Sequence, residues 1–234
     1  MFKTRSNEKE LLDQDGIPAP DLYQNLRELD FINHWLGGYN ISFSALKKVL
    51  KPGKTYVLAD IGCGGGDTLK RIFNWNEKVG FELDLHGIDL KPVCIAYAET
   101  NLSGKHVNLI CDDYRNLFRH VKKVDIIHAC LFCHHLTQQQ LAGLMHFALQ
   151  HRAILIINDL ERNPVAYYSI KFLTRLFSKS YLVKNDAPLS VLRGFKRVEW
   201  VKMIQEAGVK TFSVRNKWAF RHEIIIYGDA GKSL

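Results

Sequence analysis

VLADIGCGGGD, residues 57–67, joins an apolar run that is typical of a buried strand to a sequence that is typical of a helix. Glycines at such a junction let the backbone turn sharply and approach a ligand, because no Cβ stands in the way. The unpaired N–H groups at the start of the following helix can bind a polar group. The stretch therefore predicts a ligand-binding loop at the carboxyl end of the first strand of an α/β sheet.

The spacing of the glycines indicates which ligand the loop binds. A dinucleotide fingerprint, G-x-G-x-x-G, needs its third glycine at position 67, where Asp67 stands. An acidic residue followed by G-x-G-x-G does fit, with Asp60, Gly62, Gly64 and Gly66. For the loop taken alone, a plain glycine turn between strand and helix remains the alternative.

Strand and helix patterns alternate after this loop. Alternation of this kind implies βαβ units, right-handed crossovers and a mostly parallel sheet. Two final apolar runs, about 210–217 and 221–227, are close enough in sequence to form an antiparallel hairpin. We predict a Rossmann-like, seven-stranded α/β sheet that is mostly parallel with an antiparallel C-terminal strand. The other expected strands are 56–61, 85–88, 107–111, 124–131 and 153–157, and the expected helices are 67–76, 92–101, 137–150 and 196–207.

Further helices are expected outside this alternation. Residues 1–20 are polar and suggest a loosely held lead-in; helices then follow, from Asp21 to Gly37-Gly38 and at about 41–51. The segment 160–195 is an insertion, with a helix near 165–178 and a loop at Asp186-Ala187-Pro188. We expect residues 1–50 to be a helical lid or lead-in and residues 51–234 to be the main domain, with the insertion covering a substrate. The alternative is that the N-terminal helix packs on the sheet edge.

Acidic residues follow the next two predicted strands. Asp89 closes the second strand, where a carboxylate can accept hydrogen bonds from both hydroxyls of a ribose. Asp112 and Asp113 follow the third strand, and 128–131 end the fourth. Open α/β sheets bind ligands at the carboxyl ends of their strands, so these motifs support one another. Alone, Asp89 is equally well explained as a solvated loop residue.

Taken in order, the motifs of residues 55–227 resemble those of class I S-adenosylmethionine-dependent methyltransferases. In more detail, the chain resembles small-molecule methyltransferases of the ubiquinone/menaquinone C-methylase-like group, some of which are encoded beside polyketide synthases. That finer resemblance is carried by the stretches NLRELDFINHWLGG, DLERNPVAYY, LTRLFS and DAPLSVLRGF. It implies S-adenosyl-L-methionine as cofactor and a small phenolic, quinone-like or polyketide molecule as acceptor.

The resemblance also implies roles for single residues. Asp60 would face the amino end of the methionine moiety, directly or through water. Leu90 would pack on the adenine face, and Asp112 would contact the adenine amino group, with Asp113 as the second choice. The backbone around Ala129 would line the methionine side.

The stretch CLFCHH, residues 130–135, invites comparison with a metal site. A single C-x-x-C with adjacent histidines lacks the separated second ligand pair of a structural zinc site, so we expect no metal. His134 or His135 is instead a candidate general base for the acceptor's proton. Packing of either imidazole against backbone carbonyls is the alternative. Asp159 is expected either to line the pocket or, preferably, to cap the next helix.

Three residues of the insertion are candidates for the substrate pocket. Tyr167 and Tyr168 belong to an apolar stripe at helical spacing, which is also typical of a core-facing helix. Arg193 lies in a predicted loop, where it can bind an anionic group of the substrate or simply be a surface residue.

Composition limits the class of protein. The chain has 234 residues, 47% of them hydrophobic, and carries a formal charge of +8. It shows no apolar run long enough to span a membrane, and no secretory signal is recognisable. The five cysteines are odd in number and lie mostly in apolar stretches, which favours reduced thiols and a cytoplasmic location.

We therefore expect an enzyme that transfers a methyl group from S-adenosylmethionine to a hydroxyl oxygen or an aromatic carbon of a small molecule. A methyltransferase of RNA or protein is the first alternative. It is disfavoured because no basic or zinc module is appended and CLFCHHL stands where N-P-P-[YF] would mark transfer to an amino group. No nucleic-acid partner is expected, and the second alternative is a cofactor-binding relative without catalysis.

Overall fold

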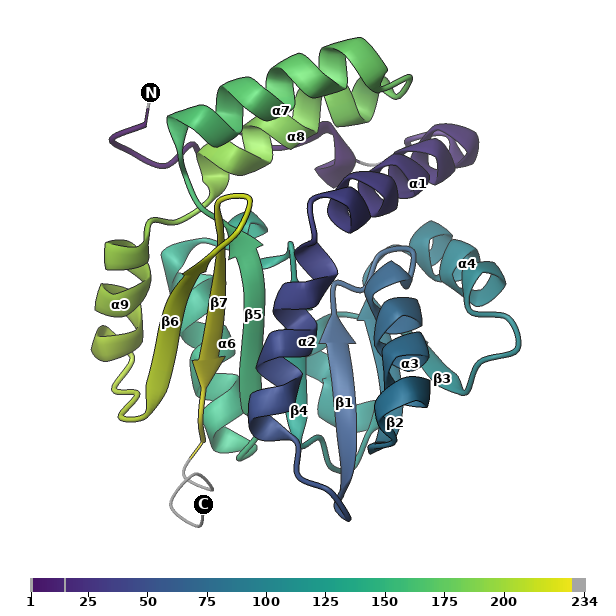
Figure 1. Cartoon of the computed structure of the whole chain (residues 1–234), viewed down its shortest axis with the longest axis vertical. Coiled ribbons are helices and arrows are strands. Elements are labelled where there is room, and N and C mark those ends of the chain that lie inside the picture. Colours follow the sequence, from purple (N-terminus) through teal and green to yellow (C-terminus); the bar gives the residue numbers. More distant parts are fainter. Residues whose placement is uncertain (1, 15, 229–234) are drawn as a thin grey trace.

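A seven-stranded β-sheet forms the centre of the protein, as predicted, and helices cover both of its faces (Figure 1). The computed structural model describes residues 2–14 and 16–228. The strands are β1 (Thr55–Ile61), β2 (Glu82–Asp89), β3 (Val107–Cys111), β4 (Ile126–Cys130), β5 (Ile154–Leu160), β6 (Phe212–Lys217) and β7 (Arg221–Ile226). Their order in the sheet is β3-β2-β1-β4-β5-β7-β6.

The pairing directions match the predicted topology. β1 pairs in parallel with both β2 and β4, and β5 is parallel to β4. β7 is antiparallel to both β5 and β6, so the C-terminal hairpin is confirmed. The strand order reverses direction between β1 and β4, and in open α/β sheets ligands bind at such a switch point.

The longer helices have the following bounds: α1 (Ala19–Trp35), α2 (Gly38–Val49), α3 (Asp67–Val79), α4 (Pro92–Asn101), α6 (Gln138–Gln150), α7 (Pro164–Phe177), α8 (Tyr181–Arg193) and α9 (Arg197–Glu206). The short helical turns are η1 (Leu11–Asp13), η2 (Tyr114–Asn116), α5 (Leu117–His120) and η3 (Cys133–His135). Figure 1 shows α1, α7 and α8 beyond the carboxyl ends of β1 and β5. Among the described residues, no helix has both the length and the apolar character needed to cross a membrane.

The two faces of the sheet bury two separate apolar clusters. Side chains alternate between the faces of a strand. Thus Leu58 packs with residues of α2, α3 and α4, while its neighbour Ala59 packs with residues of α6 and α9. Because both faces are buried, the central strands appear in the sequence as nearly continuous apolar runs.

The loop expected around Asp186 and Pro188 is wrong, because both residues lie within helix α8. Proline inside a helix removes a backbone hydrogen bond, so the helix needs stabilisation from elsewhere. Ser180 caps it by accepting from the N–H of Val183, and the Asp186 carboxylate accepts from the N–H groups of Leu11 and Leu12. Tertiary contacts with the N-terminal segment therefore overrule the local turn signal.

The N-terminal segment is also more ordered than a loose lead-in. Glu10 is 2% exposed, and the N–H of Ser6 donates to the Leu192 carbonyl of α8. Helix α1 begins two residues before the expected cap Asp21, directly after Pro18. Residues 2–14 thus lie along α8 and reach the end of the sheet.

Candidate functional site

A cavity of about 930 Å³ opens at the carboxyl ends of the parallel strands. The loops after β1, β2, β3 and β4 form its floor, and residues of η1, α1 and α6 form its walls. The residues contributed by the strand ends include Gly62, Gly64, Asp89, Leu90, Asp112 and Cys130. The position predicted for a ligand and the position of the cavity therefore coincide.

The glycine loop has the backbone conformation that its sequence predicts. Gly62, Gly64 and Gly66 all have positive φ, at 63°, 52° and 74°. Gly62, Gly64 and Gly65 line the cavity. Gly66 lies outside the lining; a Cβ there would stand 2.7 Å from Cδ1 of Leu102, so this glycine allows close packing of α3 against α4.

Asp89 joins the glycine loop to the next strand. Its Oδ2 accepts from the N–H of Gly64 and its Oδ1 from the N–H of Lys91, both at 2.9 Å. Burial raises the pKa of this carboxyl above its usual value. Leu90, which also lines the cavity, is 68% exposed and offers a free apolar surface.

Asp112 lies in the cavity wall with its oxygens already engaged by neighbours. Oδ2 lies 2.7 Å from Nε2 of His120, and Oδ1 accepts from Nδ2 of Asn116. The His120 contact is the main reason that the pKa of Asp112 falls to about 2. Asp113 lines the cavity as well.

Asp60 and Ala129 lie behind the cavity rather than in its lining. Oδ1 of Asp60 is 2.7 Å from Nδ1 of His128, whose Nε2 is 2.9 Å from Oγ of Ser42 on α2. Ala129 is fully buried, and the residues just after it, 130–132, face the cavity instead. Asp60 therefore has a visible structural role, which is to help hold α2 on the sheet.

The two candidate histidines occupy different environments. His135 lines the cavity, and its Nδ1 lies 3.1 Å from Oδ1 of Asp13. His134 is 2% exposed, and its Nδ1 lies 2.7 Å from Oδ1 of Asp159. The preference for Asp159 as a helix cap is wrong, because Asn163 caps α7 by accepting from the N–H of Val165.

The predicted substrate residues of the insertion lie apart from the cavity lining. Tyr167 is buried with its ring 5.6 Å from that of Phe2, and Tyr168 is 60% exposed. Arg193 ends α8 in a buried position, where its guanidinium donates to the carbonyl oxygens of His134 and His135. It therefore fixes the turn that carries both histidines.

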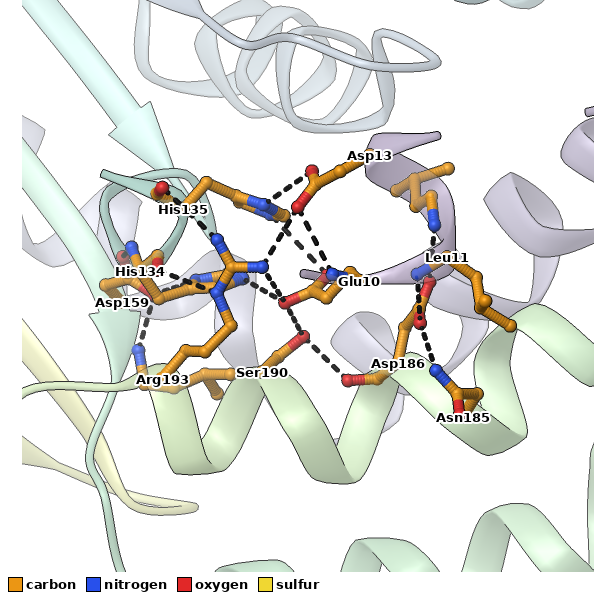
Figure 2. A network of polar contacts seen from close by, with 12 residues as sticks. Glu10, Leu11, Asp13, His134, His135, Asp159, Asn185, Asp186, Ser190 and Arg193 are labelled. Atoms are coloured by element: carbon orange, nitrogen blue, oxygen red, sulfur yellow. Dashed lines mark hydrogen bonds and ion pairs between the residues drawn. The ribbon is translucent and has the colours of Figure 1, made fainter. Parts of the chain in front are cut away.

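Glu10 and Asp13 were missed by sequence reasoning because they lie in a polar segment without periodicity. The structure brings both to the histidines, and Asp13 lines the cavity (Figure 2). Burial raises the pKa of Glu10. For Asp13, burial also raises the pKa, but hydrogen bonds and charge from His135 and Arg193 outweigh it, and the pKa lies well below its usual value.

Arg221 is a second functional candidate that the sequence did not reveal. It is 3% exposed, and its Nε and Nη1 have no hydrogen-bond partner within the described part of the chain. It lies beside Asn33, a cavity residue whose Oδ1 is likewise unpaired, since both atoms stand within 3 Å of a Cβ built on Gly38. A buried unpaired guanidinium is costly unless an anionic partner arrives.

Residues 58–152, which carry the glycine loop and most of the cavity floor, match the family model of a methyltransferase domain. This part of the chain therefore resembles methyltransferase domains. The match ends before the insertion at 160–195 and before the C-terminal hairpin. A comparison with curated proteins gives no match.

Solved structures of methyltransferases share the fold of this chain. The plantazolicin methyltransferase BpumL in complex with SAH has a TM-score of 0.63 at 19% identity, covering 90% of this chain and 89% of that one. The CMeT domain of a citrinin polyketide synthase has a TM-score of 0.55 at 14% identity, covering 78% and 48%. A candidate O-methyltransferase from Nostoc punctiforme has a TM-score of 0.55 at 13% identity, covering 82% and 57%.

Proposed function

We propose that the enzyme transfers the methyl group of S-adenosylmethionine to a hydroxyl oxygen or an aromatic carbon of a small phenolic, quinone-like or polyketide molecule. One observation carries the proposal: the glycine loop with Asp89 and the pair of His135 and Asp13 line the same cavity. A cofactor on the first and an acceptor beside the second would face each other. The fold then contributes mainly by positioning, since the cofactor supplies the reactive methyl.

The cofactor would lie along the strand ends. The two ribose hydroxyls would donate to Asp89, the adenine would pack against Leu90 near Asp112, and the methionine part would cross the loop at Gly62 and Gly64. In this arrangement the methionine carboxylate would approach Asn33 and the unpaired guanidinium of Arg221. Such a pair would relieve the cost of burying that guanidinium, which supports this direction of the cofactor.

His135 is the better placed of the two candidate bases. Asp13 holds its Nδ1, which leaves the Nε2 lone pair for a proton of the acceptor. A phenol with a pKa near ~10 is mostly protonated at neutral pH, so a base would contribute roughly 10²-fold or more in rate. His134 is buried behind His135 and would help to position it, since both belong to the turn η3. An aromatic carbon already activated by its ring needs the base less.

The N-terminal segment and the insertion would form the cover of the pocket. Asp13 and Leu12 of η1 already line the cavity, and α8 packs against η1. Arg193 and the tyrosines of α7 would then serve this cover rather than touch the acceptor directly. The five free cysteines fit a reducing, cytoplasmic setting for the reaction.

Two measurements, made one after the other, test the proposal. Calorimetry should first show binding of S-adenosylhomocysteine; binding of NAD in its place would overturn the cofactor assignment. Turnover with labelled cofactor and a panel of phenols, quinols, short peptides and RNA then identifies the acceptor. His135→Ala should lower kcat by roughly 10²-fold on a phenolic acceptor without changing cofactor affinity. Methylation of RNA or protein alone would contradict the small-molecule assignment.

A further inference from the structure

Three polar side chains come together next to the cavity wall. Glu10, His134 and His135 each direct one potential ligand atom so that these atoms lie within 4.8 Å of one another. Figure 2 shows both imidazoles directed toward the Glu10 carboxylate, which also contacts Arg193 and Ser190. The three residues come from two segments far apart in the sequence.

Each imidazole is held at Nδ1 by a second carboxylate. Nδ1 of His134 lies 2.7 Å from Oδ1 of Asp159, and Nδ1 of His135 lies 3.1 Å from Oδ1 of Asp13. A carboxylate at Nδ1 fixes the tautomer with the proton on that nitrogen and leaves the Nε2 lone pair exposed. Metal-binding histidines in proteins almost always have such a partner on the ring nitrogen that does not bind the metal.

The two imidazoles contact Glu10 at distances that leave space for an ion, although Oε1 of Glu10 also accepts from Oγ of Ser190. Nε2 of His134 lies 3.6 Å from Oε1 of Glu10, and Nε2 of His135 lies 3.8 Å from Oε2. Both separations exceed the usual N···O hydrogen-bond range. Two ligands at about 2.1 Å from a tetrahedral ion stand roughly 3.4 Å apart, so small side-chain movements would complete the site.

We propose that Glu10, His134 and His135 bind a divalent first-row transition metal, with Zn²⁺ as the best match. Two imidazoles and one carboxylate suit such ions, whereas Mg²⁺ and Ca²⁺ prefer sites made wholly of oxygen. Three protein ligands leave one tetrahedral position open. Since His135 lines the cavity, that open position would be accessible to a bound molecule.

Further acidic side chains lie around the three candidate ligands. Asp159 and Asp13 contact the two imidazoles, and Asp186 accepts from the N–H groups of Leu11 and Leu12 next to Glu10. Arg193 comes within 3.7 Å of Glu10, but its donors go to Asp13 and to the carbonyls of both histidines. It therefore fixes the ligand-bearing turn, and its contact with Glu10 is longer than a hydrogen bond.

The proposed metal site can be tested without knowing the acceptor, because ion binding is measured in the absence of turnover. It does compete with one part of the proposed function, since Nε2 of His135 has a single lone pair. With the ion bound, the ion would take over the polarisation of an acceptor hydroxyl. Without it, Nε2 remains free as a base.

The test uses the full chain without an affinity tag, stripped with chelator and dialysed against buffered Zn²⁺. We expect close to one Zn²⁺ per chain by elemental analysis and a binding isotherm by calorimetry. His134→Ala and Glu10→Gln should each weaken Zn²⁺ binding by 100-fold or more. Asp159→Asn should weaken it by about 10- to 100-fold, the scale for a partner that orients a ligand.

Two controls keep the result interpretable. His106→Ala removes an exposed histidine outside the site and should leave Zn²⁺ binding unchanged. Cys111→Ser removes the exposed thiol and should also leave it unchanged, which separates the site from thiol binding. Circular dichroism confirms that each variant is folded. A wild-type chain without stoichiometric Zn²⁺, or binding that survives both His134→Ala and Glu10→Gln, would overturn the inference and leave a metal-free acid–base cluster.

Discussion

Oδ1 of Asp159 lies 2.7 Å from Nδ1 of His134, and both side chains are almost fully buried. The same carboxylate accepts from the backbone N–H of His134 through Oδ2. One side chain at the end of β5 thus fixes both the ring and the backbone of η3. The position of His135 at the cavity wall depends on this contact, because η3 is a single turn.

Asp159→Asn should therefore destabilise the protein by about 2 kcal/mol, the scale for hydrogen bonds to a charged group in a buried site. Urea unfolding at pH 7.5 measures it. Burial raises the pKa of Asp159, but the charge and hydrogen bonds of His134 lower it further, so the native pKa lies below the unfolded one. This contribution is present above the unfolded pKa of about 3.9 and is lost as the pH falls below it. Asp84→Asn, at an exposed contact with His86, is the control and should cost under about 1 kcal/mol.

Gly62→Ala should abolish cofactor binding and destabilise the fold by more than its backbone conformation alone explains. A Cβ at Gly62 would lie 2.2 Å from Cδ2 of Phe132, at a φ of 63°. Gly80→Ala is the matched control, because Gly80 has a φ of 73° and no atom within 4 Å of its added Cβ. The control should lose about 1 kcal/mol. Equal losses in the two variants would show that the Phe132 contact has no energetic weight.

Asp89→Ala should weaken binding of S-adenosylhomocysteine by roughly 1–3 kcal/mol, the scale for removing a hydrogen-bonding partner. The loss has two sources, because Asp89 also accepts from the N–H of Gly64 and holds the glycine loop. Asp89→Asn keeps an oxygen for one of these contacts and should lose less. Calorimetry with both variants measures the difference, and an unchanged affinity in Asp89→Ala would remove Asp89 from the cofactor site.

Arg221→Met should weaken S-adenosylhomocysteine binding by about tenfold or more, equal to at least ~1.4 kcal/mol. It should leave the free protein as stable as before or more so, because the guanidinium has unpaired donors that a thioether lacks. Arg215→Met, on the exposed side of β6, is the control for loss of charge and should change neither quantity. A large loss of stability with unchanged affinity would assign Arg221 to the fold instead.

Asp67, at the start of α3, should make stability depend on pH in the acid range. Burial, helped by the charge of Asp30, raises its pKa from 3.8 to about 6. A carboxyl with a raised native pKa contributes stability that is full below the unfolded pKa and is lost as the pH rises through the native one. Wild-type stability should fall between about pH 4 and pH 6, and Asp67→Asn should flatten this part of the profile in urea unfolding. An unchanged slope would contradict the raised pKa.

The sequence predicted the fold because its signals are local. Leu58 and Ala59 belong to a short apolar run that is typical of a strand buried on both faces, and the glycines that follow are typical of a tight turn. The order of strands and helices and the C-terminal hairpin follow from patterns of this range, whereas strand ends do not, since β2 spans Glu82–Asp89 where 85–88 was expected. Two expectations about the fold failed, the loop at Pro188 and the loosely held lead-in, and both lie where a contact between distant segments decides the conformation.

The sequence by itself determined one side of the cavity, since Gly62, Gly64 and Asp89 are placed by the strands that precede them. Only the tertiary structure decided the other side. Glu10 lies more than a hundred residues from His134, and no spacing rule connects a polar N-terminal segment to a turn after β4. Their contact depends on η1 docking against α8, and through it on the packing of the whole insertion. The burial and the charge around Glu10 and His134 arise from packing between distant segments, and local sequence patterns do not predict such packing.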